Sequence, residues 1–529
     1  FRYIDCQIQI LKQCPSTRQV REALTKLPAT LEDIYFNAIE KLKNSLCFKE
    51  GHYLLLWLLY SFEPLNMSQV AVILSIDLDA RKVEADAEML HGLEEVIDTT
   101  LVTVYNRNIV QLSHASVKEF LLESNRSLQE KKLININAEL AHDIIAQMCL
   151  IYLLNQSEEK DIWKNSVYMW RIDIDSIETF EQYATQYWGD HSHYINKNSL
   201  SYNKSIEIAQ IFLEQAANTF INWTKNFEAS VEWKWETNNI FAEHDKLHVT
   251  AWFGLETSAQ RLLTNTDTGM QNDLLDVNTM SKHFGTALQI AAARGHKDTA
   301  ELLLQQGAEI NAQGGHFGTA VQGAAFNGYK NIVEFLVQQG AEINTQGGLY
   351  STALQAGADN GHKDIVEFLV QHGADINAQG GYFGTALQAA ADNGHKDIVE
   401  FLVQQGADIN AQGGYFGTAL QAAAVGGHQD IVEYLVQQGA EINAQGGEYG
   451  TALQAAAYWG KKDTVEFLVQ QGAEINTQGG QYGTALQAAA YWSQKDTVEF
   501  LVQQGAEINA QGGKYVSSFL HITQILLIR

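Results

Sequence analysis

The sequence predicts an all-α protein in which a non-repetitive helical first half precedes a solenoid of stacked helix pairs. A Thr-Ala-Leu-Gln block, or a close variant, recurs seven times with a spacing of 33 residues. Apolar residues after each block have helical spacing, and residues 1–240 show such spacing without a repeat. Because one unit cannot bury its apolar face alone, the units should stack around a continuous core. The blocks begin at Thr286, Thr319, Thr352, Thr385, Thr418, Thr451 and Thr484.

Each unit carries its own helix boundaries, as the fourth unit illustrates. Thr385 is followed three residues later by Gln388, a spacing that predicts a capping box at the first helix. Gly394 should end this helix, and Asp397 should cap the second. Gly406 stands where the end of the second helix favours a left-handed residue. Each unit is therefore predicted to be a helix-turn-helix.

The period and the pattern resemble the ankyrin repeat, with Thr-Ala-Leu-Gln standing where that family usually has Thr-Pro-Leu-His. The resemblance covers residues 281–513 and implies seven repeats that bind another protein. Residues 241–280 contain a partial match, Lys246–Gly254, and are predicted to form a degenerate capping repeat with an insertion. The pattern is lost over residues 514–529, where we expect a degenerate or truncated repeat.

Three positions vary among the seven units, while most others barely change. They lie three residues before the Thr, and seven and eight residues after it. In ankyrin repeats these positions line the concave, partner-binding face, whereas the second-helix residues Lys396, Asp397 and Glu400 hardly vary between units. Variation on one face favours a diversified binding surface over drift. The predicted partner-binding residues are His316, Leu349, Tyr382, Tyr415, Glu448, Gln481, Phe326, Asp359, Asp392, Tyr458, Trp459, Tyr491 and Trp492.

Two Tyr-Trp pairs stand out in this set, Tyr458-Trp459 and Tyr491-Trp492. Trp and Tyr side chains carry much of the binding energy at many protein interfaces. The alternative is that these rings pack against the next repeat. We expect a protein ligand, because an open, aromatic and acidic groove suits a protein surface better than a small molecule.

Four stretches within residues 1–200 of the first half form an ordered set, Phe1–Cys6, Leu112–Leu121, Ala141–Leu150 and Tyr183–Trp188. With these stretches, the first half resembles the region that follows the NTPase module in fungal NACHT-type STAND proteins, the NOD-like receptors of filamentous fungi. The resemblance implies a possible intramolecular contact with an upstream NACHT domain. It also implies three parts, which are a helical segment after a missing NTPase at 1–45, a winged-helix-like domain at 46–126 and a helical linker domain at 127–240.

The pattern between residues 46 and 126 agrees with a winged helix, which serves as a regulatory lid in STAND proteins. Acidic residues such as Glu84 and Glu88 argue against DNA binding by this module. The expected elements are helices at 51–62, from a cap at Ser68 through Leu74, and at 87–97, then strands at 101–104 and 109–112 around a turn at 106–108, and a last helix after Ser113.

His114 follows the second predicted strand and opens that last helix. In related STAND switches a histidine at this place contacts the phosphate of bound ADP, so the resemblance implies a nucleotide-sensing role. The free backbone N–H groups at a helix start favour anions, which is compatible with such a role. Ala115 and Ser116 depart from the commoner His-Asp pairing, and a capping or core histidine is the alternative.

Composition excludes several other functions. The 529 residues carry a net charge of -27, which opposes binding to nucleic acid and to anionic membranes. The longest apolar run, Tyr53–Tyr60, is shorter than the roughly 20 residues that a membrane span requires. The four cysteines have no CxxC spacing, so we expect reduced thiols in a cytoplasmic protein and no metal site.

No phosphate-binding loop, His-Glu-x-x-His or Gly-x-Ser-x-Gly motif occurs, so we expect neither catalysis nor a cofactor. The chain starts at Phe1, which suggests a fragment. Three hypotheses remain: the sensor half of a fungal NACHT receptor, a free-standing ankyrin adaptor or scaffold, and part of a multidomain enzyme with an upstream catalytic effector. The coding sequence upstream of Phe1 distinguishes them.

Overall fold

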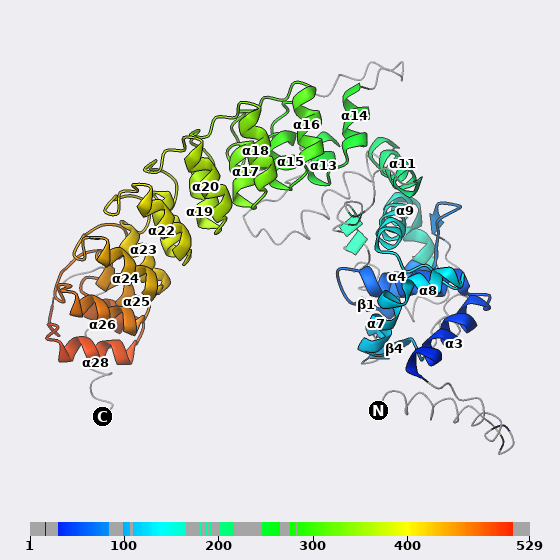
Figure 1. The fold of residues 1–529 in the computed structure, drawn as a ribbon, viewed down its shortest axis with the longest axis horizontal. Helices are drawn as coiled ribbons and strands as arrows, with labels where there is room; N and C mark the ends of the chain where they lie inside the picture. Colours follow the sequence, from blue (N-terminus) through cyan, green and yellow to red (C-terminus); the bar gives the residue numbers. More distant parts are fainter. Residues whose placement is uncertain are drawn as a thin grey trace. The chain divides into compact units, whose positions relative to one another are not determined.

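The computed structural model describes residues 30–83, 99–105, 109–165, 200–215, 246–264, 276–281 and 283–510, together with residues 16 and 19 and seven positions between 180 and 194. The chain divides into two compact units, Phe1–Glu243 and His244–Arg529. Helices dominate both units, which confirms the predicted fold class (Figure 1). Within the described ranges, no helix has the length and apolar character that would let it cross a bilayer.

Three helices begin the described part of the first unit, and the last of them starts differently from the prediction. The predicted cap at Ser68 is wrong, because Ser68 already lies in the first helical turn. Asn66 has the extended backbone of a cap, and its side chain accepts the Gln69 N–H at 2.8 Å while the Gln69 side chain accepts the Asn66 N–H at 2.9 Å. The helices are α3 (Leu31–Lys43), α4 (Phe48–Tyr60) and α5 (Met67–Leu74).

A small antiparallel sheet follows, with strands β1 (Leu65–Asn66), β4 (Val102–Tyr105) and β5 (Ile109–Leu112) in the order β1-β5-β4. Val110 is the register partner of both Leu65 and Val104. The strands predicted at 101–104 and 109–112 are present, the first displaced by one residue. The helix predicted at 87–97 and the turn predicted at 106–108 lie outside the described residues.

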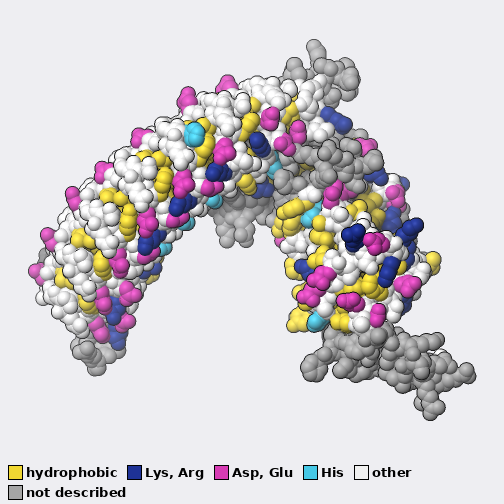
Figure 2. Space-filling view, viewed as in Figure 1, with side chains coloured by type: hydrophobic (Ala, Val, Ile, Leu, Met, Phe, Trp, Pro, Cys, Tyr) yellow, Lys and Arg dark blue, Asp and Glu magenta, His cyan; other side chains and the backbone are white. Residues whose placement is uncertain are grey.

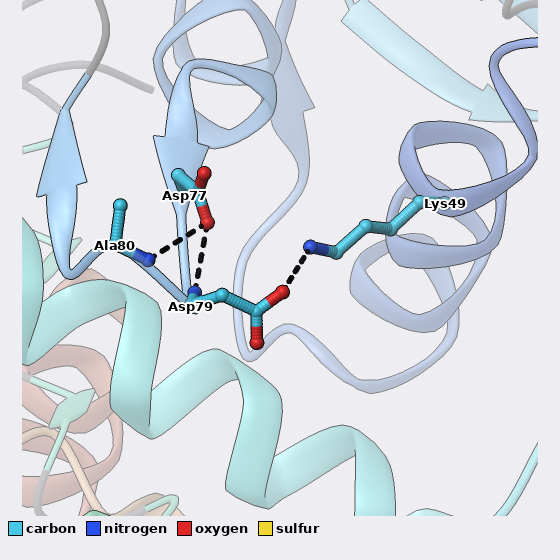
Figure 3. A network of polar contacts seen from close by, with 4 residues as sticks. All are labelled: Lys49, Asp77, Asp79 and Ala80. Carbon is cyan, nitrogen blue, oxygen red and sulfur yellow. Dashed lines mark hydrogen bonds and ion pairs between the residues drawn. The ribbon is translucent and has the colours of Figure 1, made fainter.

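A second hairpin, β2 (Ile76–Asp77) with β3 (Lys82–Val83), is joined to α4 by polar contacts (Figure 3). The Asp77 carboxylate accepts the N–H groups of Ala80 and Asp79, and these bonds hold the pKa of Asp77 below its usual value. The Asp79 carboxylate pairs with the Lys49 ammonium at 2.9 Å. Because the pair is exposed, it contributes at most about 1 kcal/mol.

The rest of the first unit encloses a buried network of aromatic and imidazole groups. The Nδ1 atoms of His142 and His191 lie 2.7 Å apart, and the Tyr183 hydroxyl lies 2.8 Å from His191 Nε2. A bond between two ring nitrogens holds one proton, so at most one ring can be cationic. Burial lowers the pKa of both rings, that of His142 to about 4. The helices are α7 (Ala115–Glu123), α8 (Asn125–Glu130), α9 (Ala138–Asn165) and α11 (Leu200–Gln215).

The second unit begins with α13 (Lys246–Trp252) and α14 (Glu256–Thr264) and continues as seven helix pairs along a curved array (Figure 1). The first helices α15, α17 and α19 lie toward the inner side of the curve, and their partners α16, α18 and α20 lie toward the outer side. The tail predicted at 514–529 lies outside the described residues. The pairs are α15 (Ala287–Ala293) with α16 (Lys297–Gln305), α17 (Ala320–Phe326) with α18 (Lys330–Gln338), α19 (Ala353–Asp359) with α20 (Lys363–Gln371), α21 (Ala386–Asp392) with α22 (Lys396–Gln404), α23 (Ala419–Gly426) with α24 (Gln429–Gln437), α25 (Ala452–Tyr458) with α26 (Lys462–Gln470) and α27 (Ala485–Tyr491) with α28 (Lys495–Gln503).

The predicted capping box is confirmed in all seven first helices. The predicted cap of the second helix is wrong. The cap position of α22 is His395, which makes no side-chain cap bond, and Asp397 lies in the first turn. Asp397 instead pairs with Lys363 of the preceding repeat at 3.7 Å. Gly394 and Gly406 follow the two helices with φ of 80° and 91°, the left-handed conformation expected there.

Buried Gln388 and half-buried His395 connect the fourth repeat to its neighbours. The Gln388 amide Nε2 donates to the carbonyls of Ala411 and Gly417 in the next repeat, at 3.1 and 2.6 Å. His395 Nε2 donates to the Asp359 carbonyl of the preceding repeat at 2.9 Å. Gln388 therefore combines a helix cap with a link between repeats. An orphaned buried polar group costs about 1–3 kcal/mol, so these partners matter for stacking.

The helix pair α13–α14 makes the same type of link to the first repeat. His296 Nε2 donates to the Trp252 carbonyl at 2.8 Å. This bond is equivalent to the one from His395 to the Asp359 carbonyl of the preceding repeat. The Trp252 ring also packs edge-on against Phe284, with 5.1 Å between centroids. The pair α13–α14 therefore stacks against the array as the helix pair before the first repeat.

Candidate functional site

The loop tips between repeats form a hydrogen-bonded row that places one variable position in register with the next. The backbone N–H of Glu448 donates to the Tyr415 carbonyl at 3.0 Å, and the N–H of Tyr415 donates to the Tyr382 carbonyl at 2.8 Å. Equivalent bonds join Gln481 to Glu448, and Leu349 through His316 to His283. The side chains three residues before each Thr are therefore brought into neighbouring positions along the array.

The row has one discontinuity, between Leu349 and Tyr382. In six repeats the residue before the Thr is a glycine with φ between 79° and 98°, but the third repeat has Ser351 with φ of 69°. The following Gly380 has φ of 154°, and a Cβ at Gly380 would meet the Ser351 side chain. Among the described residues, the bond from the Tyr382 N–H to the Leu349 carbonyl is missing. A side chain at a glycine position thus divides the row into two segments.

The other two variable positions lie at the end of each first helix and differ in burial. The indole rings of Trp459 and Trp492 are 48% and 55% exposed. Tyr458, which was predicted to be exposed for binding, is only 8% exposed, so the alternative of packing within the array holds for this ring. Its burial comes from residues of the neighbouring loops.

Tyr458 lies at the centre of an aromatic cluster that fixes both exposed indoles. Its ring centroid is 4.3 Å from that of Tyr482, and the two hydroxyls are 3.2 Å apart. Trp459 and Trp492 meet the Tyr458 ring edge-on, with centroid distances of 5.3 and 5.8 Å. Tyr491 is parallel to Tyr458 at 6.4 Å. The exposed rings therefore rest on a packed aromatic base.

Sequence reasoning missed Tyr449 and Tyr482, which belong to this cluster. Tyr449 stacks with Tyr482 at 6.2 Å and packs against Tyr458 at 5.2 Å, both as ring centroid distances. The signal was available, because an aromatic residue stands two positions before the Thr in every repeat. Because this aromatic position is constant, it was not among the variable positions predicted to bind a partner. Its rings nevertheless pack against Tyr458 and so support the exposed tryptophans.

Two carboxylates lie at the ends of first helices three and two repeats before Trp459. Asp359 and Asp392 occupy equivalent positions in consecutive repeats, and partial burial raises the pKa of each to about 6. The charge of Asp359 further raises the pKa of Asp392, whereas a bond from Asn393 to Asp359 at 2.7 Å opposes the shift at Asp359. Two neighbouring carboxyls are thus held in an environment that disfavours their charge.

Glu448 extends the acidic row toward the exposed indoles. The Glu448 N–H donates to the Tyr415 carbonyl at 3.0 Å, the Tyr415 ring meets that of Tyr449 edge-on at 5.9 Å, and desolvation raises the pKa of Tyr415. Tyr415 also stacks on Tyr382 at 4.9 Å. These contacts connect the two kinds of residue into one surface, which we call the acidic–aromatic face. It comprises Asp359, Tyr382, Asp392, Tyr415, Glu448, Trp459 and Trp492.

Lysines of the array take part in a different row. On the second helices, Lys330, Lys363 and Lys396 each pair with an aspartate of the next repeat, at 3.9, 3.7 and 3.4 Å. Figure 2 shows basic and acidic side chains side by side along the array. In the described part of the chain, no ion pair involves Asp359, Asp392 or Glu448. The carboxylates of the acidic–aromatic face therefore lack a basic counter-ion among these residues.

The remaining predicted positions are less exposed or less connected. Phe326 packs on Tyr350 at 4.7 Å, and His316 lies 5.9 Å from His283, both as ring centroid distances. Leu349 is exposed at the discontinuity, and Gln481 is partly exposed at the end of the row. These four positions belong to the row of loop tips and first-helix ends but do not gather into one cluster.

His114 in the first unit is a helix cap. Its Nδ1 accepts the Ser116 N–H at 3.1 Å at the start of α7. The Ser116 hydroxyl lies 2.7 Å from the same nitrogen and 2.9 Å from the Tyr35 hydroxyl. The capping alternative therefore accounts for the contacts of this ring in the structure.

Comparisons with known proteins agree with this architecture. The relatives include an azaphilone pigments biosynthesis cluster protein L of Monascus ruber, 26% identical over 311 residues, which cover 54% of this chain and 61% of that protein. The human ASB11 ankyrin repeat domain is 24% identical with a TM-score of 0.37, over 44% of this chain and 99% of that chain. A family model for ankyrin repeats matches residues 247–347, 324–413, 381–446, 411–479 and 446–512. These matches together span half of the sequence, and the chain belongs to the ankyrin-repeat family.

Proposed function

We propose that the array is the ligand-binding sensor region of a fungal NOD-like receptor of the NACHT/STAND type. A protein ligand would bind the inner side of the array, and binding would be relayed to a nucleotide switch upstream. One observation carries the binding part: the glutamine that joins the repeats is constant in all seven, whereas the three positions that supply the acidic–aromatic face vary among the seven repeats.

The physical character of the face supports a protein as the ligand. Trp459 and Trp492 are exposed yet held by Tyr458, so little side-chain freedom is lost when a partner covers them. Exposed aromatic residues on a rigid base are typical of hot spots at protein interfaces. Ankyrin repeats are an interaction scaffold, and the acidic–aromatic face offers a concrete place for that interaction.

The receptor part of the proposal rests on the first unit. The matching stretches Leu112–Leu121 and Ala141–Leu150 fall on the β5–α7 segment and on α9. The order α4, α5, sheet β1-β5-β4, α7 is compatible with a winged helix. His114 would be the nucleotide-sensing residue of such a lid, since its exposed ring stands at the start of α7.

Affinity capture tests the binding part. The full chain and its Trp459→Ala/Trp492→Ala variant are used as baits in extract of the source organism, and captured proteins are quantified by mass spectrometry. We expect a partner that the wild type enriches and the variant loses. Tyr105→Ala, which removes an exposed aromatic of the first unit, should retain that partner. Equal recovery by all three baits would refute the face as the binding site.

The upstream coding sequence tests the receptor part. A phosphate-binding loop of the Gly-x-x-x-x-Gly-Lys-[Ser/Thr] type encoded in frame before Phe1 is expected. A start codon directly before Phe1 would refute the receptor and leave the free-standing adaptor, which would use the same binding face.

A further inference from the structure

We propose that the ligand of the acidic–aromatic face is a basic protein segment, whose Lys or Arg side chains lie against the exposed indoles and between the carboxylates of Asp359, Asp392 and Glu448. This inference rests on the proposed binding function and adds the chemistry of the partner. It follows from the position of the indoles, the proximity of the carboxylates and the distribution of basic residues.

The exposed indoles of Trp459 and Trp492 offer aromatic surface to which a cationic side chain can bind. Each indole is roughly perpendicular to the Tyr458 ring, at interplanar angles of 80° and 87°, and about half of each tryptophan is exposed, so indole surface remains accessible to a partner. The face of a tryptophan carries the negative part of its quadrupole and attracts ammonium and guanidinium groups better than other side chains do.

A row of contacts leads from Glu448 to the aromatic base that supports these indoles. The Glu448 N–H donates to the Tyr415 carbonyl at 3.0 Å, the Tyr415 ring lies 5.9 Å from the Tyr449 ring, and the Tyr449 ring lies 5.2 Å from that of Tyr458. Toward the other end, the charges of Asp392 and Glu448 both act on Tyr382. A cationic side chain at this surface would therefore find an aromatic ring and a carboxylate together, which strengthens both contacts.

The negative charge of the acidic–aromatic face is complementary to a basic partner. The chain carries a net charge of -27, and the lysines that pair across repeats lie on the second helices. The array itself contains one example of the proposed contact: at the same repeat position as Trp459, the first repeat has Arg294, whose guanidinium lies 4.7 Å from the Trp252 ring. A second copy of this chain is disfavoured as the occupant because both copies are strongly acidic.

A direct binding experiment tests this inference. A fluorescein-labelled peptide of Lys-Gly-Ser repeats is titrated with the full chain, and binding is followed by fluorescence anisotropy. The counterpart peptides have each Lys replaced by Glu or by acetyl-lysine. The variants are Trp459→Ala/Trp492→Ala and Glu448→Gln, with Tyr105→Ala and Glu441→Gln as controls. Glu441 is matched to Glu448 because it is an exposed glutamate of the same inter-repeat loop.

We expect the lysine peptide to bind and the other two peptides to bind weakly or not at all. The tryptophan pair should raise the dissociation constant about 10-fold, since each exposed cation–π contact is worth a few-fold in affinity. Glu448→Gln should raise it about 3-fold, whereas both controls should match the wild type. Salt should weaken binding of the lysine peptide because the carboxylates are accessible to counter-ions.

Two results would overturn the inference. Equal affinity of the lysine peptide for the wild type and the tryptophan variant would mean that net charge alone attracts it. A dimer in sedimentation that the tryptophan variant abolishes would mean that a second copy occupies the face.

Competition separates this inference from the proposed function. If capture of the cellular partner depends on Trp459 and Trp492 but the lysine peptide does not displace it, the inference fails and the binding function stands. If capture ignores the tryptophan pair, the binding function itself fails. Displacement by the lysine peptide and not by its glutamate counterpart would support both.

Discussion

Ser351 is the place where a single substitution should make the array more stable. Six repeats have a left-handed glycine before the Thr, and Ser351 adopts the same conformation at φ of 69°. A left-handed conformation costs a residue with a Cβ roughly 1–2 kcal/mol. Restoring the missing bond from Tyr382 to Leu349 adds about 1 kcal/mol, and the greater freedom of glycine in the unfolded chain subtracts about 1 kcal/mol. Ser351→Gly should therefore stabilise the array by ~1–2 kcal/mol.

The reverse change in the next repeat is the matched control. Gly384→Ser places a Cβ at φ of 96°, where it would approach the Gly413 backbone carbon at 2.8 Å. We expect this variant to lose at least ~1–2 kcal/mol of stability. Urea unfolding of the full chain gives the stability difference, and hydrogen exchange of the Tyr382 amide reports whether the row of loop tips has been completed. A Ser351→Gly variant that is less stable than the wild type, or a neutral Gly384→Ser variant, would refute the strain argument.

Three further outcomes are expected. Gln388→Ala should lower the stability of the array by ~2–4 kcal/mol, because a cap bond and two bonds to the next repeat are lost; hydrogen exchange of α21 should rise, and an effect no larger than that of Gln404→Ala would contradict this. The first unit should become less stable as pH falls below about 6.5, by roughly 2 kcal/mol near pH 4 once solvent screening is allowed for, because the pKa of His142 is lowered to about 4 and the unfolded chain binds the proton more readily; unchanged protection factors of α9 amides between pH 7 and pH 5, after correction for the intrinsic pH dependence of exchange, would argue against it. Asp392→Asn should stabilise the array at neutral pH by ~1–2 kcal/mol, because a folded pKa of about 6 lies above the unfolded value and ionisation opposes folding; the gain should disappear below about pH 4, and a gain that persists in urea unfolding at acid pH would show another cause.

Local signals predicted the repeat unit well because they act within one helical turn. A capping box needs only Thr385 and Gln388, three residues apart, and it is present in every repeat. The same local logic failed at Asp397 and at Ser68, where a residue with cap chemistry lies one or two positions inside the helix. The backbone at His395 and Asn66, not the side-chain type alone, sets where each helix begins.

The candidate site was predicted as a set of positions but not as a surface. The three variable positions were read from the repeats, and Trp459, Trp492 and Tyr382 are exposed there. Burial of Tyr458 was not predictable from its neighbours in sequence, because the ring that covers it belongs to Tyr482, 24 residues away. The same reason concealed Tyr449, whose role comes from packing against Tyr458 and against Tyr482, which lies 33 residues away in the next repeat.

The sequence by itself determined the period, the helix boundaries within each repeat and the positions that vary, since these depend on residues a few places apart. Only the tertiary structure decided which aromatic rings are exposed, how Gln388 reaches the next repeat and where Ser351 interrupts the row of loop tips. Those properties depend on contacts between stacked repeats, which join residues about 24 to 36 positions apart. The spacing of residues within one repeat does not predict which side chains of neighbouring repeats will meet.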